Sequence, residues 1–134
     1  KVSGYALADA DLTLPQYRVL VFLVPRGRPA SHVAGLLGVT PSTVTSVVDG
    51  LVARGLVERS SDPADRRRVV LSLTSSGLDT VALGDRVVGA ALDRLLARLA
   101  PADAETALVG LELLNKAMEA ALDERFGAGA DVAR

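Results

Sequence analysis

The stretch VTPSTVTSVVDGLVARGLVER, residues 39–59, decides the fold. Thr40 followed by Pro41 is a strong helix start, because a threonine hydroxyl caps the first free N–H groups and proline is tolerated at the first helical position. Gly55 marks the end of this helix. Four apolar residues recur at helical spacing and predict one buried face: Val44, Val47, Val48 and Leu51.

The opposite face of this helix is small and polar. It carries Ser42, Ser46, Asp49, Gly50 and Ala53, flanked by Thr43 and Thr45. Such a face can enter a major groove, where hydroxyls bond base edges and a threonine methyl contacts thymine. An ordinary surface helix rich in serine and threonine is the alternative interpretation.

A shorter helix is expected just upstream. Ser31 is its N-cap candidate, and Gly38 stops it in the usual position. The two helices, joined by Gly38-Val39-Thr40, form a helix-turn-helix candidate over residues 31–54.

A β-hairpin should follow the helix-turn-helix. Residues 56–59 and 69–73 are predicted strands, and residues 60–65 form the turn. Arg66, Arg67 and Arg68 lie beside that turn, where arginine can enter a minor groove. Asp65 is placed to brace Arg67. Solvated charges on an ordinary hairpin are the alternative.

Helices are also expected on both flanks. Thr13 and Gln16 form a capping box for a helix ending near Val24. Thr74 or Ser76 caps a long helix reaching about Leu99, and Pro101 starts the last one. Their apolar stripes predict a dimer interface rather than only an intramolecular helical hairpin; its candidate residues are Leu92, Leu95, Leu99, Leu108, Leu111, Leu114 and Met118.

Composition narrows the function. The chain has 134 residues, no cysteine, one histidine and a net charge of −1. Residues 1–74 carry nine basic and six acidic side chains, whereas residues 75–134 carry six and ten, so the basic part is the first half. Thiol chemistry and a histidine-rich metal site are excluded. We expect no enzyme, cofactor, metal or membrane span, and a cytoplasmic location.

Several segments in order resemble the MarR (multiple antibiotic resistance regulator) family. They are residues 12–20 (LTLPQYRVL), residues 39–59, and DPADRR at 62–67 with LSLTSSG at 71–77. The resemblance covers residues 12–77. It implies a mainly helical winged helix-turn-helix fold with a small β-hairpin wing, in which the terminal helices form a dimerisation part.

The resemblance also implies a homodimer on a pseudo-palindromic site in double-stranded DNA. Ser42, Thr43, Thr45 and Ser46 would face bases, and Arg66 or Arg67 would enter the minor groove. Release by a small-molecule effector is typical of the family, but the sequence names no ligand-binding residue. Ser46 and Gly50 stand where the family often has arginine, which implies fewer phosphate contacts.

We therefore expect a sequence-specific transcription regulator, a repressor; a winged-helix module that binds protein is the alternative. The whole chain, 1–134, is one domain: 12–74 binds DNA, 1–11 and 75–126 dimerise, and 127–134 is a flexible tail. Because the chain begins with Lys1, an N-terminal piece is expected to be missing. The candidate DNA-binding residues are Ser31, Thr40, Ser42, Thr43, Thr45, Ser46, Arg54, Asp65, Arg66, Arg67 and Arg68.

Overall fold

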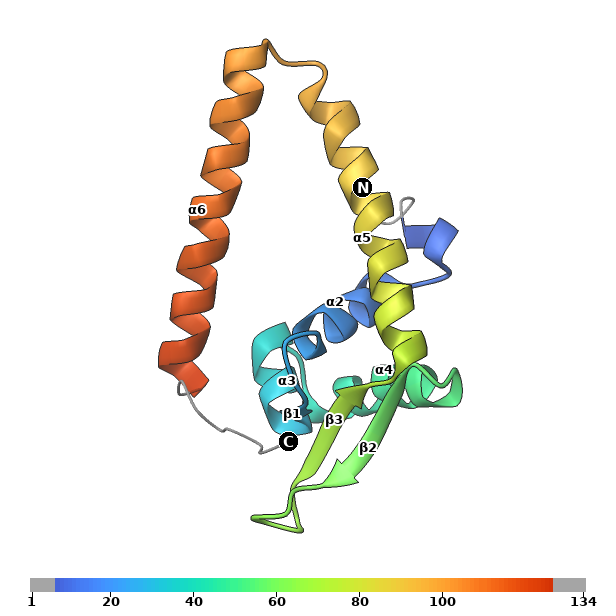
Figure 1. Ribbon diagram of the computed structural model, residues 1–134. Helices are drawn as coiled ribbons and strands as arrows, with labels where there is room; N and C mark the ends of the chain where they lie inside the picture. Colours follow the sequence, from blue (N-terminus) through green and yellow to red (C-terminus); the bar gives the residue numbers. More distant parts are fainter. Residues whose placement is uncertain (1–6, 127–134) are drawn as a thin grey trace. The chain divides into compact units, whose positions relative to one another are not determined.

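The computed structural model describes residues 7–126 (Figure 1). The chain divides into two units after Val88. The first unit contains η1 (Leu7–Ala10), α2 (Leu14–Leu23), β1 (Arg28–Pro29), α3 (Ala30–Leu37), α4 (Pro41–Ala53), β2 (Val57–Ser61) and β3 (Val69–Leu73). Helix α5 (Ser75–Leu96) begins in the first unit and ends in the second, which also holds α6 (Pro101–Phe126). The predicted class, mainly helical with a small β-hairpin, is confirmed.

The helix boundaries follow local capping chemistry. Thr13 and Gln16 form the predicted capping box: the Gln16 N–H donates to the Thr13 hydroxyl at 3.3 Å, and the Thr13 N–H donates to the Gln16 side chain at 3.0 Å. Gly38 and Gly55 follow α3 and α4 with φ of 65° and 70°, a conformation that glycine adopts without strain. Thr74, not Ser76, caps α5, because its hydroxyl accepts the Gly77 N–H at 3.0 Å.

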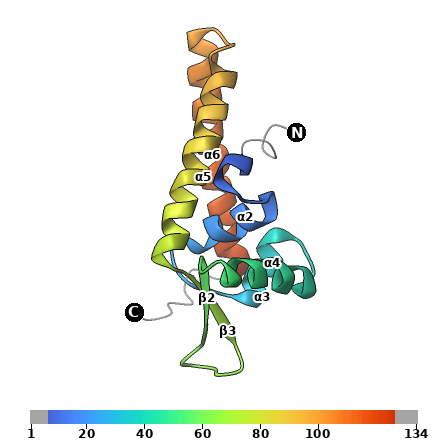
Figure 2. The same ribbon diagram turned by 90° about the vertical axis from the view of Figure 1, so that its right-hand side faces the viewer.

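The sheet has three antiparallel strands in the order β1-β3-β2. The β2–β3 pair is the predicted hairpin, and it extends beyond α3 and α4 in both views (Figures 1 and 2). Strand β1 was not predicted, since two residues carry no periodicity. Strand β1 pairs with β3 and leads directly into α3, so α3 begins at Ala30, immediately after Pro29. The prediction that Ser31 is the N-cap of this helix was therefore wrong.

The core of the first unit lies between the helices and the sheet. The predicted face of α4 supplies Val44, Val48 and Leu51, all at most 3% exposed, while Val47 packs at the edge of the core. Strands β2 and β3 contribute Val57 and Leu71. Leu7 of η1 is fully buried in the same cluster, so the N-terminal turn helps to close this core.

Helix α5 is attached to α2 within the first unit. The Tyr17 hydroxyl donates to Asp85 Oδ1 at 2.6 Å, and Gly84 leaves room for the tyrosine ring against the α5 backbone. Partial burial and this carboxylate raise the pKa of Tyr17 well above its ordinary value. Asp85 thus interrupts the apolar stripe of α5 because it is the acceptor of this hydrogen bond.

The second unit is built from the end of α5 and from α6. Helix α5 ends at Leu96 rather than near Leu99, because the backbone hydrogen bonds beyond it change to the 3₁₀ pattern. The Arg98 N–H donates to the Leu95 carbonyl at 3.1 Å, and the Leu99 N–H donates to the Leu96 carbonyl at 3.0 Å. Six of the seven predicted dimer residues are exposed by 39–57% of their surface: Leu95, Leu99, Leu108, Leu111, Leu114 and Met118. Leu92 is half-buried. The predicted tail, 127–134, and residues 1–6 lie outside the described residues.

Gly77 offers a direct test of how α5 joins the first unit. A methyl group there would overlap the backbone carbonyl of Leu56. We expect Gly77→Ala to lower the free energy of unfolding by about 1–3 kcal/mol, as overpacking does. The control is Gly89→Ala in the same helix, where a methyl group meets nothing within 4 Å. It should stabilise the helix by up to about 1 kcal/mol. Equal urea midpoints for both variants would contradict the packing described.

Candidate nucleic-acid interface

Helix α4 presents its polar face to solvent. Burial of the valines and of Leu51 leaves Ser42, Thr43, Thr45 and Ser46 exposed on the other side. No charged or long apolar side chain stands among these four hydroxyl groups. A helix of this profile can approach the floor of a groove closely.

The hydroxyl groups at the start of α4 are already ordered. The Thr40 hydroxyl is within 3.0 Å of the Ser42 hydroxyl and 2.9 Å of the Thr43 hydroxyl, and it accepts the Thr43 N–H at 3.3 Å. The Thr45 hydroxyl donates to the Pro41 carbonyl at 3.0 Å. The Ser46 side chain makes no hydrogen bond within residues 7–126, so its hydroxyl group can both donate and accept hydrogen bonds with a ligand.

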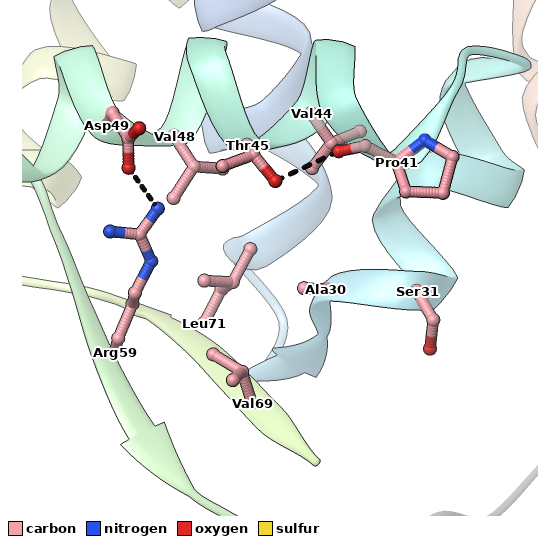
Figure 3. Close-up of a pocket in the computed structure, with 10 residues that line it drawn as sticks. All are labelled: Ala30, Ser31, Pro41, Val44, Thr45, Val48, Asp49, Arg59, Val69 and Leu71. Carbon is pink, nitrogen blue, oxygen red and sulfur yellow. Dashed lines mark hydrogen bonds and ion pairs between the residues drawn. The ribbon is translucent and has the colours of Figure 1, made fainter. Parts of the chain in front are cut away.

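A hollow of about 530 Å³ adjoins this face (Figure 3). Its lining is mostly apolar and comes from α3, α4 and the sheet: Ala30, Pro41, Val44, Val48, Val69 and Leu71. Ser31, Thr45, Asp49 and Arg59 are its polar residues. The Arg59 guanidinium donates to the Asp49 carboxylate across the hollow, so an ion pair ties α4 to strand β2.

The turn of the hairpin is held by two aspartates. Asp62, 7% exposed, accepts the Ala64 N–H at 2.9 Å and lies 3.9 Å from an Arg68 nitrogen. Asp65 accepts the Arg67 N–H at 3.1 Å and lies 3.4 Å from Arg67 Nε, which confirms the predicted brace. The Arg67 side chain is nevertheless 93% exposed. A rigid turn therefore carries a solvent-facing arginine.

Other kinds of site receive no support from the described part of the chain. Within it, no three His, Asp or Glu side chains come together as a metal ion would require. No single helix there is long and apolar enough to cross a membrane; α3 and α4 meet that length and composition only as a pair bent by 111°.

Comparisons with known proteins agree on one family. The model of the MarR family matches residues 10–68. The uncharacterized HTH-type transcriptional regulator YfiV of Bacillus subtilis is 32% identical over 115 residues, covering 85% of this chain and 72% of YfiV. The chain belongs to the MarR family. The transcriptional regulator HosA of Escherichia coli O111:H- is 31% identical, over 82% of this chain and 80% of HosA.

One of the similar solved structures contains DNA. The transcriptional repressor CouR, bound to a 23-mer DNA duplex, matches with a TM-score of 0.72 and 30% identity, over 84% of this chain and 81% of CouR. This MarR-family protein is accordingly a winged helix-turn-helix transcription regulator, and the β2–β3 hairpin is its wing.

The structure brings most predicted site residues of this MarR-family protein onto the first unit's polar surface, but Arg54 is engaged elsewhere. Arg54 Nη1 donates to the Asp11 carbonyl at 2.7 Å, and Nη2 lies 3.5 Å from the Asp11 carboxylate. Ser31 is exposed at the hollow. Sequence reasoning missed Arg59 and Asp62 as supports of the site. The cluster Asp62–Asp65 at the turn was a signal for Asp62, whereas nothing local indicates the Asp49–Arg59 pair.

Proposed function

We propose that the protein is a cytoplasmic repressor that binds a pseudo-palindromic DNA site as a homodimer. Helix α4 lies in a major groove, and Arg66 or Arg67 of the wing enters the adjoining minor groove. Residues 12–74 act as the DNA-binding part, and residues 75–126 supply the dimer contacts.

One observation carries this proposal: an uncharged hydroxyl face and a braced, exposed arginine turn stand on the same unit. A hydroxyl group can both donate a hydrogen bond to a base edge and accept one from it. Arginine is favoured by the negative potential of a narrow minor groove. Ser42, Thr43, Thr45 and Ser46 fall in the first half of α4, which is the part of a recognition helix that meets bases.

The apolar surface of the second unit supports the dimer. Exposed leucines on α6 include Leu108, Leu111 and Leu114, with Met118 on the same stripe. A monomer in water rarely leaves such a continuous apolar stripe uncovered. A second copy of the chain can cover it symmetrically, and the same two-fold symmetry would present two α4 helices to two half-sites.

Selection of bound duplexes from a random pool tests the function directly. We expect an enriched inverted repeat whose half-sites are about one helical turn apart, since two recognition helices must reach the same face of the duplex. Affinity should fall steeply as salt rises, because bound phosphates release counterions. A pool without enrichment, or binding indifferent to salt, would refute a DNA-binding regulator.

The wing arginines can be tested on the selected duplex. The double variant Arg66→Ala, Arg67→Ala should weaken binding to every duplex. It should also flatten the slope of log Kd against log salt by about 0.9 for each phosphate that the variant no longer neutralises. Fluorescence anisotropy at several salt concentrations measures both quantities. Arg98→Ala, outside the winged part, is the matched control and should change neither. An unaltered slope in the double variant would exclude the wing from the DNA interface.

The dimer can be tested by sedimentation equilibrium at micromolar protein concentration. The native chain should have twice the mass of one chain. Leu111→Glu with Leu114→Glu should yield monomers, because carboxylates cannot be buried unpaired in an apolar interface. Lys116→Glu, a charge change at a polar position of the same helix, serves as control and should stay dimeric. A native chain with the mass of a monomer would contradict the proposal.

A further inference from the structure

Helix α4 lacks the charge that a DNA-binding element ordinarily contributes. Its sequence, PSTVTSVVDGLVA, contains no lysine or arginine. Phosphate contacts supply much of the affinity of such proteins, so the positive charge has to come from neighbouring elements. Residues 12–48, which form α2, β1, α3 and the first half of α4, contain three arginines and one histidine but no carboxylate.

Strand pairing gathers part of this charge at one place. Strand β1 runs antiparallel to β3, with Arg28 opposite Leu71 and Pro29 opposite Val70. The chain that leaves β1 into α3 therefore runs beside the residues that precede β3. This brings the first turn of α3, with His32, toward Arg68, the last residue of the wing's turn before β3, and within reach of its charge. Arg26 lies in the turn before β1.

We propose that Arg26, Arg28, His32 and Arg68 form a second contact site for backbone phosphate, beside the groove in which α4 lies. This inference rests on the proposed function and names a part of the DNA interface other than the face of α4 and the wing arginines Arg66 and Arg67. We call these four residues the β1–α3 cluster.

The β1–α3 cluster carries more positive than negative charge. Asp62, with an oxygen 3.9 Å from an Arg68 nitrogen, offers one carboxylate at the edge of the cluster. Arg28 Nε donates to the Phe22 carbonyl at 2.7 Å, which fixes the guanidinium without neutralising it through that bond. Arg26 is exposed and makes no hydrogen bond or ion pair within residues 7–126. A phosphodiester would supply the opposite charge that Arg26 lacks.

His32 reports on the electrostatics of the cluster. Partial burial, followed by the charges of Arg68, Arg28 and Arg26, lowers the pKa of His32 below its ordinary value. A bound phosphate would oppose that effect and favour the imidazolium. Proton uptake would then accompany binding, so affinity should increase as pH falls through the range between the pKa of the free protein and the higher pKa of the complex.

The cluster also lies on the side of the unit that carries the hydroxyl face. Ser31, the residue before His32, lines the hollow together with Thr45 of α4 (Figure 3). Phosphates border a major groove about 12 Å wide on both sides. A helix lying in the groove therefore places the start of α3 near one of these phosphate rows.

The inference can be tested by measuring the pKa of His32 by proton NMR. Because the chain has one histidine, the imidazole C–H resonances can be assigned to His32 without ambiguity. We expect the pKa of His32 to rise by about one pH unit when the selected duplex is added, the size of effect that a nearby opposite charge produces. In the free protein, Arg26→Gln should raise the pKa of His32, since it removes a repelling charge. A duplex that binds without changing the pKa of His32 would overturn the inference and leave the proposed function standing.

Affinity measurements give an independent readout. Arg26→Gln should reduce the slope of log Kd against log salt by about 0.9. The ratio between the Kd of the variant and that of the native chain should therefore be roughly 3.5-fold smaller at 200 mM salt than at 50 mM salt. His32→Gln should abolish the gain in affinity between pH 8 and pH 5.5. Arg98→Gln is the charge-matched control and should bind like the native chain. Native slope and pH dependence in both variants would overturn the inference, whereas a native chain that binds no duplex would overturn the proposed function with it.

Discussion

The buried stripe of α4 is the constraint on which the functional surface depends. Val44, Val48 and Leu51 are withdrawn from water almost completely, and each is worth roughly 1.5–3 kcal/mol of burial. Rotating α4 to expose a different face would forfeit that energy. The hydroxyl groups of Ser42, Thr43 and Ser46 therefore face outward because the valines cannot. The same packing that stabilises the first unit thus selects the face that we propose meets DNA.

Local braces convert this orientation into a rigid surface. The Asp49–Arg59 ion pair connects α4 to the wing, and Asp62 and Asp65 hold the turn by accepting the Ala64 and Arg67 N–H groups. Tyr17 and Gly84 attach α5 to α2 through a hydrogen bond and close packing. Surface ion pairs contribute little to stability, at about 0–1 kcal/mol each, so the value of these contacts lies in positioning the side chains.

The distribution of charge along the chain is more informative than its net charge. A net charge of −1 gives no hint of a nucleic-acid partner, yet the carboxylates are absent from residues 12–48 and concentrated after residue 75. At physiological salt, the interaction between exposed charges decays over a Debye length of about 8 Å, so charges near a bound phosphate act on it more strongly than distant ones. Arg66 and Arg67 stand on the wing, an element that enters a groove in the proposed arrangement, so the location of positive charge counts for more than the net charge.

The sequence by itself determined the helices, the caps at Thr13 and Thr40, the hairpin and the buried face of α4, because these depend mainly on residues close together along the chain. Thr40, Gly38 and the brace of Asp65 on Arg67 belong to this local class. Only the tertiary structure decided that Arg28 and Pro29 form a strand, that α3 begins at Ala30, and that Arg54 turns to Asp11. It also decided that Asp49 meets Arg59 and that the charge of Arg68 acts on His32. These contacts join residues brought together by sheet pairing and core packing, for which no spacing along the chain provides a signal.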